Sequence, residues 1–442
     1  MKLPIRLLPA IAVLILGLGT TPVHAQDFYW NAAGARSLAL GGVYVPSSAG
    51  ALEALATNPA GLTVLSGRTL DLSVTGMFAR GSFTNSANQN APMTTSPGVM
   101  PYGAFGTPIG HSRFSFGIGV IPEMMSVSDW RYVDAPGVAG ATYGVQEQKA
   151  AILAARSVAG FGISFGPRLA VGATVGVDYN QNTLQAPYIF QQQAVLAGLK
   201  TMLDLHTSGI GWNTSVGVIA RPSRKVTFGL AWKSRTVINS EGHASGDAGA
   251  QFGALGLTGV PADFRYSASV RNVLPQSMIG SVNWRVDPRW LLAFQTNWVN
   301  WKDAFVTLPV ALTNGTNAAI NGLLNSTSLN DGVPLDWKDQ FSFHGGFERL
   351  LTESVSVRGG FAHGNNPVPN STLSPLTAAI MGNQITTGLG YRHGPYRFDL
   401  AYAYGLRGQA SVQHSALLSG EYSNSQVQVG TQSLTLNTSI QF

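Results

Sequence analysis

The stretch YRFDLAYAYGLR, residues 396–407, alternates between two kinds of side chain along its whole length. Its even-numbered residues are large and apolar or aromatic, whereas its odd-numbered residues are small or charged. Successive side chains of a β-strand point to opposite faces, so this period of two predicts a strand with one apolar face. We expect the even-numbered residues to face outward. The odd-numbered ones, with Arg397, Asp399 and Arg407 among them, are expected to face inward.

The same alternation recurs over residues 168–179, 114–120 and 226–232. In each stretch one face is apolar and uncharged, and the other is mostly Gly, Ala, Ser or Thr, with Arg168 and Asp178 as its few charges. A cation on a lipid-facing position near the membrane midplane costs about 2–4 kcal/mol, which explains the uncharged faces. A soluble sheet would carry many Lys and Glu residues on its polar face. The pattern therefore favours a barrel with lipid outside and a crowded lumen inside.

Strands of this kind follow one another through most of the chain. We expect them near residues 68–80, 98–107, 112–121, 148–158, 167–182, 210–220, 225–238, 268–286, 290–302, 339–349, 354–364, 383–392, 395–407 and 427–442. The long connections between them lie near 81–97, 122–147, 183–209, 239–267, 303–338, 365–382 and 408–426, and short ones include 108–111, 222–224, 287–289 and 393–394. Short periplasmic turns and longer extracellular loops are typical of outer-membrane barrels. The predicted fold is all-β, a 14-stranded antiparallel transmembrane β-barrel over residues 68–442.

Composition and the two chain ends agree with a bacterial outer-membrane location. Charged residues are 11% of the chain, against a usual value of about 25%, and there is no Cys. The net charge of +6 is too weak and scattered for nucleic-acid binding. Residues 1–25 combine a basic start, an apolar run and small residues before Gln26, which predicts a secretory signal peptide. The chain ends at Phe442, an aromatic terminus typical of clients of the barrel-assembly machinery, so we expect that machinery as a partner.

Residues 26–67 precede the first expected strand and do not resemble a strand pair. They are rich in Ala and Gly, and residues 45–60 are too apolar for a loose tail. Larger barrels can be filled by a segment of their own chain. We therefore expect residues 26–67 to form a compact plug inside the lumen.

Several short motifs, in order along the chain, resemble the FadL-type outer-membrane transporters of long-chain fatty acids and aromatic hydrocarbons. The motifs are GARSLALGG at 34–42, NPAGL at 58–62, GLAWKSR at 229–235, LPQS at 274–277, DWKD at 336–339, RGGF at 358–361 and NPVP at 366–369. The resemblance implies a barrel closed at its periplasmic end by a hatch, with Asn58, Pro59 and Ala60 as hatch residues. It also implies a ligand that rests on the third long loop, enters a pocket within the barrel, and leaves sideways into the membrane at an inward kink of the third strand.

The third long loop, residues 183–209, has apolar residues at helical spacing. We expect an amphipathic hairpin with a ligand groove formed by Val195, Leu196, Leu199, Met202 and Leu203. The alternative is that this stripe only packs on the barrel rim. For the kink of the third strand, Gly weakens a strand and Pro cannot donate to its ladder. These properties single out Gly117, Gly119 and Pro122, although they could equally be ordinary lumen and loop residues, and we expect Asn58–Ala60 to touch the kink.

A fatty-acid carboxylate would favour a cation near the ligand. The candidates for head-group binding are Lys200, the one basic residue of the third loop, together with Lys233, Arg235 and Arg358. Each could instead be paired with an acidic neighbour. A neutral aromatic hydrocarbon or alkane needs only apolar and aromatic walls, so both ligand classes stay open.

We expect a passive uptake channel for small hydrophobic molecules. Long-chain fatty acids are the expected ligands, and neutral hydrocarbons are the alternative. We expect the channel to act as a monomer without a cofactor. Its surroundings would be outer-membrane lipid and lipopolysaccharide, which hinders apolar solutes. A general porin would need an open, charge-lined constriction, which a plugged lumen argues against. A hydrolase is disfavoured because Ser164, in Gly162–Gly166, matches the G-x-S-x-G pattern at a turn instead of a strand–helix junction. A surface adhesin is the remaining alternative.

Overall fold

The computed structural model describes residues 33–46, 50–94, 98–380, 382–420 and 422–442. The expected signal peptide, residues 1–25, and residues 26–32 of the expected plug lie outside the described residues.

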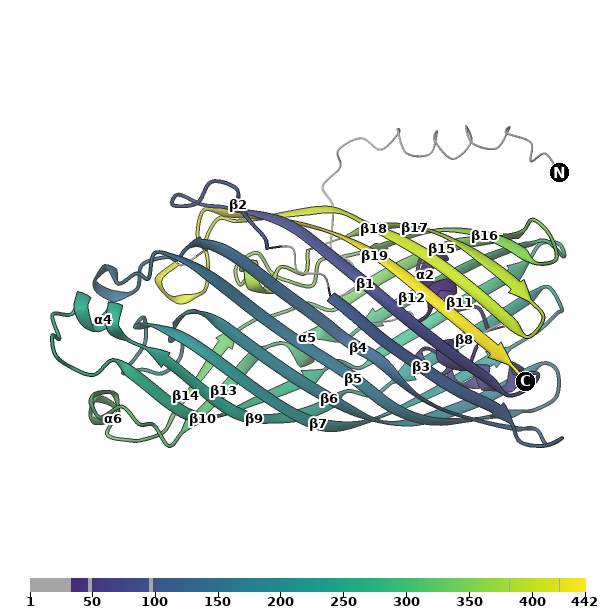
Figure 1. The fold of residues 1–442 in the computed structure, drawn as a ribbon, viewed down its shortest axis with the longest axis horizontal. Coiled ribbons are helices and arrows are strands. Elements are labelled where there is room, and N and C mark those ends of the chain that lie inside the picture. The colour runs from purple at the N-terminus through teal and green to yellow at the C-terminus, as the bar shows by residue number, and fades with distance from the viewer. Residues whose placement is uncertain (1–32, 47–49, 95–97, 381, 421) are drawn as a thin grey trace.

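The described strands form one closed antiparallel barrel (Figure 1). The strand segments are β1 (Thr69–Thr84), β2 (Ala91–Pro92), β3 (Gly98–Pro108), β4 (Phe114–Val133), β5 (Val145–Ser164), β6 (Leu169–Ile189), β7 (Lys200–Ala220), β8 (Val226–Lys233), β9 (Thr236–Asp247), β10 (Asp263–Leu274), β11 (Ser277–Arg285), β12 (Trp290–Val299), β13 (Thr307–Thr313), β14 (Leu329–Pro334), β15 (Gln340–Leu350), β16 (Val355–Gly364), β17 (Asn383–His393), β18 (Tyr396–Val412) and β19 (Ser425–Gln441). The ring closes where β1 pairs with β19, from Thr69 opposite Gln441 to Thr84 opposite Gln426. Several segments continue one another, as β8 and β9 do, so the barrel has the expected 14 strands.

Short helices lie within the barrel and in its loops. They are α2 (Ala35–Ala39), α3 (Ala51–Ala56), η4 (Pro59–Val64), η5 (Val138–Gly140), α4 (Gly249–Ala254), α5 (Trp301–Ala304), α6 (Ala318–Leu324), η6 (Pro375–Thr377) and η7 (Leu418–Gly420). None of the helices in the described residues is long and apolar enough to cross a bilayer.

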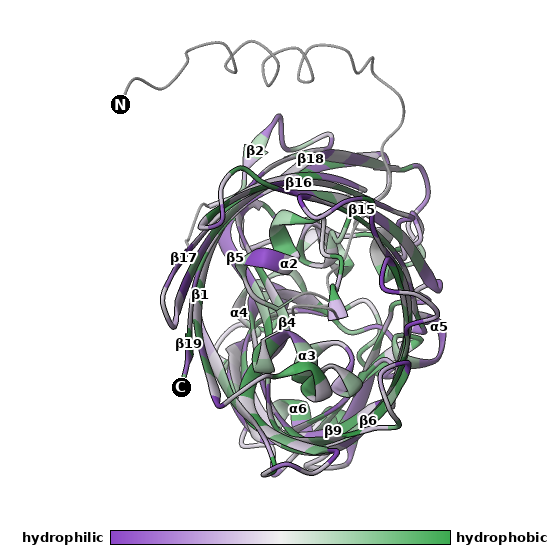
Figure 2. Ribbon diagram, turned by 90° about the vertical axis from the view of Figure 1, so that its right-hand side faces the viewer, coloured by the Kyte–Doolittle hydropathy of each residue, from purple (hydrophilic) through white to green (hydrophobic). Residues whose placement is uncertain are grey.

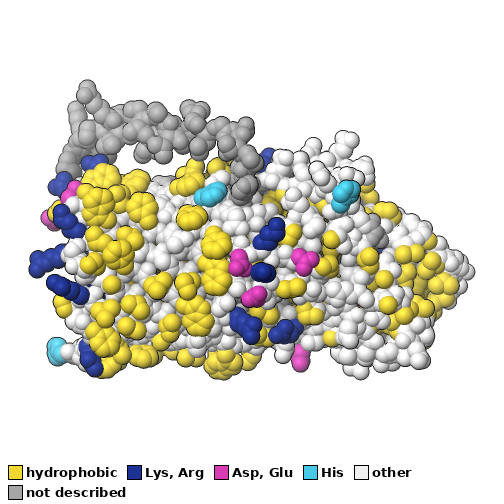
Figure 3. All heavy atoms as spheres, turned by 180° about the vertical axis from the view of Figure 1, so that it is seen from behind, with side chains coloured by type: hydrophobic (Ala, Val, Ile, Leu, Met, Phe, Trp, Pro, Cys, Tyr) yellow, Lys and Arg dark blue, Asp and Glu magenta, His cyan; other side chains and the backbone are white. Residues whose placement is uncertain are grey.

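The barrel has a short-turn end and a long-loop end. The short-turn end includes the connections at 109–113, 165–168, 221–225, 286–289, 351–354 and 394–395, and the long-loop end carries α4, α6 and the longer connections. Figure 3 shows apolar side chains gathered in a band on the outer surface near the short-turn end. Lys and Arg side chains cluster at that rim, and a row of charged side chains lies beyond the other edge of the band.

The alternation read from the sequence matches the direction of the side chains. In β18, Tyr396, Phe398 and Leu400 are 43%, 45% and 37% exposed on the outer surface, whereas Ala401 and Asp399 are buried in the lumen. The same holds in β6, where exposed apolar residues alternate with buried small or polar ones. The apolar faces therefore lie on the outside of the barrel, as the period of two predicts.

One expectation about β18 is wrong. The register of β18 against β19 shifts between Gly405 and Gly408, which marks a β-bulge at Leu406 and Arg407. A bulge adds one residue to a strand and exchanges the two faces beyond it. Arg407 is consequently exposed on the outer surface instead of facing the lumen as expected.

The N-terminal segment, residues 33–46 and 50–65, lies inside the ring of strands (Figure 2). Helix α2 contacts β16 to β19, α3 contacts β1, β3, β4 and β5, and η4 contacts β3 to β7. Leu52, Leu55 and Leu62 form an apolar cluster with Tyr102, Ile121 and other residues of the wall. The segment is therefore packed into the lumen on most sides.

Strands β3 and β4 separate partway along their length. Their pairing runs from Pro108 opposite Ser115 to Gly103 opposite Val120. Beyond that level, β3 continues along β1 and β4 continues along β5. Over residues 98–102 and 121–128 the described strands share no ladder, and contact resumes at a single bridge between Met93 and Trp130. We call this interruption of the wall the β3–β4 gap.

Candidate ligand-binding cavity and its surroundings

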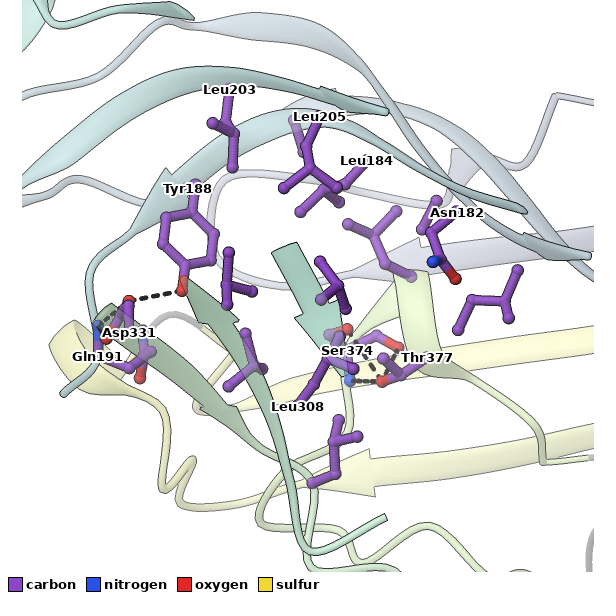
Figure 4. Close-up of a pocket in the computed structure, with 18 of the residues that line it drawn as sticks. Asn182, Leu184, Tyr188, Gln191, Leu203, Leu205, Leu308, Asp331, Ser374 and Thr377 are labelled. Atoms are coloured by element: carbon purple, nitrogen blue, oxygen red, sulfur yellow. Dashed lines mark hydrogen bonds between the residues drawn. The ribbon is translucent and has the colours of Figure 1, made fainter. Parts of the chain in front are cut away.

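An apolar cavity, here called the inner cavity, lies inside the barrel toward its long-loop end (Figure 4). Its lining comes from both sides of the barrel and from the loops between them. The lining residues are Ser126, Ala150–Ile152, Asn182–Leu184, Ala186–Gln191, Leu203, Leu205, Val270, Asn272, Phe305, Leu308, Val310, Leu312, Asp331, Val333, Leu335, Trp337, Ser374, Leu376, Thr377, Leu417 and Tyr422. Most are aliphatic or aromatic. The odd-numbered positions of β7 and the even-numbered positions of β13 point inward here, and those that line the cavity hold Leu or Val.

Among the described residues of this lining, Asp331 of β14 is the one Asp, Glu, Lys or Arg, and its carboxylate is already saturated. It accepts a hydrogen bond of 2.5 Å from the Tyr188 hydroxyl and bonds of 2.9, 2.5 and 3.2 Å from the backbone N–H groups of Gln191, Gln192 and Gln193. Figure 4 shows this carboxylate at one edge of the cavity, beside Tyr188 and Gln191. Its role is to hold the 190–199 loop against β14, and no Lys or Arg is found among the described residues that line the cavity.

Aromatic rings form part of the wall. Phe305 and Trp337 line the cavity with their centroids 4.8 Å apart, and both pack on Trp301 at 4.9 and 5.0 Å. Their planes meet at angles near 60°, within the edge-to-face geometry that favours aromatic contacts. Tyr422 lines the cavity as well and shares a hydroxyl contact of 3.2 Å with Tyr132. A flat apolar molecule would find rings to stack against.

The end of the cavity nearest the short turns is polar, and its amide side chains form hydrogen bonds with one another and with Thr207. Asn182 donates to Asn180 Oδ1 at 2.9 Å and to the Thr207 hydroxyl at 3.0 Å, and Asn272 donates to the same Asn180 oxygen at 3.0 Å. Within the described residues, the Oδ1 atom of Asn182 is a buried acceptor without a hydrogen bond. This edge therefore offers one acceptor to a ligand and no charge.

A second apolar cavity, the outer cavity, lies among the loops at the long-loop end. It is lined by Phe190, Leu196, Leu199–Thr201, Ala248, Gln251, Phe252, Leu257, Phe264, Tyr266, Ala319, Ile320, Leu323 and Leu329. Phe190 belongs to the linings of both cavities, so the two cavities adjoin at this residue.

The third long loop differs from the expected amphipathic hairpin. Strand β6 extends to Ile189 and β7 begins at Lys200, which leaves only residues 190–199 as a connection, and they form turns without a helix. Hydrogen bonding between β6 and β7 outweighs the helical spacing of the apolar residues. Of the expected groove residues, Leu196 and Leu199 line the outer cavity, Leu203 lines the inner cavity, Met202 lines neither, and Val195 is 51% exposed.

None of the four basic residues expected to bind a head group lines the inner cavity. Lys200 borders the outer cavity, but its Nζ is 2.7 Å from Asp134 and is fully buried. Lys233 forms an ion pair with Glu123, and Arg358 is bound to Glu348 and Asp399. Arg235 lies exposed between β8 and β9. The structure does not bring these four cations together.

The expected hatch residues lie against β6, β7 and β8. Asn58 caps η4 through the Ala60 N–H and donates to the carbonyls of Val218 and Leu230 at 3.1 and 3.2 Å. A Cβ added at Gly172 of β6 would collide with Pro59 and Ala60, so only Gly allows this close approach. The expected contact of Asn58–Ala60 with the kink stays a prediction.

The expected kink residues do lie at the β3–β4 gap. Gly117 faces Leu55 and Leu62 of the N-terminal segment, and Gly119 lies in the last paired stretch before β4 separates from β3. The register of β4 against β5 shifts between Pro122 and Met124. Four successive residues, Ile121 to Met124, are buried there, which breaks the alternation and marks an inward displacement of the strand.

Two residues of this region were not singled out from the sequence. Glu123, the extra residue of the bulge, is buried and pairs with Lys233 across the lumen and with Arg156 of β5 at 3.6 Å. The Met125 side chain lies at the β3–β4 gap against Gly98, where an added Cβ would be 3.3 Å from the methionine methyl group. A charged residue between the apolar pairs Ile121–Pro122 and Met124–Met125 was a signal for Glu123, whereas no sequence signal identified Met125.

An ion network ties the N-terminal segment to the barrel near the short-turn end. Arg36 binds Glu348 of β15 through two contacts, Nε–Oε2 at 2.9 Å and Nη2–Oε1 at 3.1 Å. Glu348 also binds Arg358 at 2.7 Å, and Asp399 links Arg358 and Arg397 at 2.7 and 2.8 Å. Arg36 is buried, so this network anchors the segment by paired charges in a protected site.

Glu53 of α3 is a second buried charge of the N-terminal segment. Burial raises the pKa of its carboxyl to about 7, although the guanidinium groups of Arg36 and Arg397 partly oppose that rise. A carboxyl with this pKa changes its charge near neutral pH. The packing of α3 is thereby coupled to protonation.

Ser164 lies where β5 ends, and its hydroxyl donates to the Gly166 carbonyl at 2.8 Å within the turn to β6. No helix follows it, so the strand–helix junction of a nucleophile elbow is missing in this described stretch.

Comparisons with known proteins give one consistent result. A family model described as outer membrane protein transport protein (OMPP1/FadL/TodX) matches residues 18–442. Among solved structures, the chain is similar to the Pseudomonas putida toluene transporter TodX, with 17% identity, a TM-score of 0.73, and coverage of 96% of this chain and 100% of that one. A Pseudomonas aeruginosa FadL homologue matches at 17% identity and a TM-score of 0.72, covering 95% of this chain and 100% of the other. The Ralstonia pickettii toluene transporter TbuX matches at 17% identity and a TM-score of 0.70, with coverage of 94% and 100%.

At this level of identity the structural likeness establishes the fold, and the family model establishes the family. None of the curated proteins compared matches the sequence significantly. The expected barrel, the expected resemblance and the expected outer-membrane location are confirmed. The chain belongs to the outer membrane protein transport family (OMPP1/FadL/TodX), a family of outer-membrane transporters of hydrophobic compounds.

Proposed function

We propose that this protein takes up small neutral apolar molecules, above all aromatic hydrocarbons, passively across the outer membrane. The observation that carries this proposal is the lining of the inner cavity, which is apolar and aromatic and, in the part of the chain that the structure describes, includes no cation and one carboxylate, which is already saturated. A carboxylate ligand would meet Asp331 there without a compensating charge, and burying an unpaired charge is costly. A neutral ring would gain contacts with Phe305 and Trp337.

The two cavities support a route in two steps. A ligand first enters the outer cavity between the loops and then passes Phe190, which lines both cavities, into the inner cavity. A change of the Phe190 rotamer is the smallest movement that would join them. Asn182 Oδ1, a buried side-chain acceptor without a hydrogen bond among the described residues, also allows a ligand with one hydroxyl group.

The β3–β4 gap supports sideways release into the membrane. Ser126 of β4 lines the inner cavity, and Met125 beside it lies at the gap. On the outer surface, a shallow depression crosses the strands at this level, lined by Leu72, Gly103, Ile118, Gly119, Val120, Trp212 and neighbouring residues. A released apolar molecule would move past Met125 into this depression and then into lipid.

We propose that residues 26–67 act as the hatch. The packing of α2, α3 and η4 against the wall, the ion pair of Arg36 and the contacts of Asn58, Pro59 and Ala60 support closure of the short-turn end. A closed end directs the ligand to the side and prevents the steady ion flow of a general porin. No energy input is required, because the ligand follows its own concentration gradient.

Equilibrium binding of radiolabelled toluene and oleate to the purified protein in detergent tests the proposal. We expect saturable toluene binding that naphthalene displaces, together with weak oleate binding that does not depend on Lys200. Tighter oleate binding that is lost in Lys200→Met would overturn the neutral class in favour of fatty acids. Large steady currents in a planar bilayer would overturn the hatch proposal and favour a porin.

A further inference from the structure

The outer surface changes from apolar to polar along three adjacent strands, β18, β19 and β1, which lie side by side in Figure 1. The outward residues of β19 are the even-numbered ones. Toward the short-turn end they include Leu436 and Leu434, which are 51% and 46% exposed. Toward the long-loop end they become Gln432, Gly430, Gln428 and Gln426. Since the long-loop end of an outer-membrane barrel is extracellular, the change marks the level of the outer-leaflet head groups.

Two arginines lie at this boundary. Arg80 of β1 is directly opposite Gly430 of β19, and the bulge of β18 brings Arg407 to the other side of the same glycine. Neighbouring strands are about 4.8 Å apart, so the two Arg backbones are separated by about 10 Å. Both side chains are exposed on the outer surface. They therefore flank one position from two sides.

Neither arginine has an acidic partner among the described residues. No ion pair involves Arg80 or Arg407, whereas Lys149, a cation near the long-loop end of β5, pairs with Glu147 at 2.9 Å and approaches Asp129 at 3.7 Å. Two unpaired guanidinium groups beside each other repel, which an anion between them would relieve.

The position between the two arginines is open. Gly430 has no side chain, and a Cβ there would lie 3.5 Å from the Arg407 backbone, which is ordinary contact. On the long-loop side of this glycine, the amide of Gln428 donates to Gln409 at 2.9 Å. On its short-turn side, the Tyr402 hydroxyl donates to Gln432 at 3.0 Å. The surroundings are thus polar, uncharged and able to form hydrogen bonds.

We propose that Arg80 and Arg407 bind the phosphate of a phosphorylated lipid head group in the outer leaflet, with Gly430 leaving room for it. Guanidinium groups bind phosphate through paired, charge-assisted hydrogen bonds. The ligand is a lipid and not a free phosphate because exposed apolar residues lie toward the short-turn end from the arginines, among them Phe78 on β1 and Leu434 on the intervening strand β19. Acyl chains of the bound lipid would cover these residues while its phosphate meets the cations.

Native mass spectrometry of the full-length protein in detergent tests this site, with purified bis-phosphorylated lipid A as the probe and its phosphatase-treated form as comparison. We expect a bound lipid A molecule on the wild-type protein, about tenfold weaker binding in Arg80→Gln/Arg407→Gln, and a similar loss when the probe lacks phosphate. A matched control, Arg168→Gln/Arg224→Gln, removes two exposed arginines from the short-turn end and should bind as the wild type does.

A second variant keeps both charges but fills the space between them. Gly430→Leu should also weaken lipid A binding about tenfold, because its side chain projects outward between the arginines. Inorganic phosphate at millimolar concentration should not displace the lipid. Equal binding by the double variant and the wild type, undiminished binding of the dephosphorylated probe, or full displacement by inorganic phosphate would each overturn the proposal.

Discussion

Arg36 of the N-terminal segment and Glu348 of the barrel wall form a two-contact ion pair in a site where the arginine is only 3% exposed. Because the partners are more than three hundred residues apart in sequence, this pair joins the first described helix to the last third of the barrel. Its position near the short-turn end makes it an attachment of the proposed hatch to the wall at that end.

We expect Arg36→Gln to loosen that attachment. The substitution leaves Glu348 with only Arg358, and breaking a buried pair costs about 3 kcal/mol. Faster hydrogen exchange over residues 33–46 and a rise in single-channel conductance should follow. Arg36→Gln/Glu348→Gln should recover part of the protection, because no unpaired carboxylate remains. Unchanged exchange and conductance in the single variant would show that the pair does not hold the segment.

Met125 should control the width of the β3–β4 gap. We expect Met125→Trp to reduce toluene uptake by cells about fivefold or more, because a larger ring fills the space beside Gly98. Val127→Trp is the matched control, since Val127 is 43% exposed on the same face of β4, beyond the contact with Gly98. Heat-modifiable migration on gels verifies that both variants assemble. Equal uptake by the two variants would exclude release past Met125.

Asp331 should determine how firmly the 190–199 loop is held. Asp331→Asn replaces one of the two acceptor oxygens with an amide donor that faces the N–H groups of Gln191 to Gln193. We expect a loss of about 2–3 kcal/mol in local stability and faster hydrogen exchange over residues 190–199. The exposed neighbour Asn330→Ala should leave exchange unchanged. A loop equally protected in both variants would contradict the assignment.

Protonation of Glu53 should affect the docking of the N-terminal segment. Its pKa in the folded protein is raised to about 7 from an ordinary value of 4.5, so the folded state binds the proton more tightly than the unfolded state. The stabilisation is therefore complete below about pH 4.5 and is lost as the pH rises through 7. Limited proteolysis of the segment should be slower at pH 5 than at pH 8. Glu53→Gln should remove this difference, and a variant that retains the full pH dependence would locate the titrating group elsewhere.

Much of the barrel could be predicted from the sequence because a strand between lipid and lumen must alternate with a period of two. The strand count, the order of long and short connections and the outward face of β6 and β18 all follow from that constraint. The bulges at Glu123 and Arg407 could not be predicted, since one extra residue changes the register without changing the composition.

The candidate site was less predictable. Leu199, Met202 and Leu203 have spacing compatible with a helix, but long-range pairing with β6 places Met202 and Leu203 in a strand. The inner cavity combines side chains from β4 to β7, β10, β13, β14 and several loops, and no local pattern encodes such a meeting. Ion pairs such as Lys233 with Glu123 depend on distances across the lumen, so the sequence could supply the cations but not their partners.

The bulge in β18 reverses which residues of the strand face outward: the even-numbered ones before it and the odd-numbered ones after it. Before it, even-numbered residues such as Tyr402 and Tyr404 contact lipid; after it, the even-numbered Val412 turns inside among the apolar residues of the lumen, and Gln409 and Ser411 turn out toward water. Deleting Leu406 would place Arg407 alone opposite Gly430 and leave Gly408 opposite Val429, so the strand would become regular and both faces beyond the bulge would be kept. A deletion at any other paired position of β18 would instead exchange the lipid-facing and lumen-facing residues as far as the loop, so the bulge is the place where this strand can lose one residue without changing its faces.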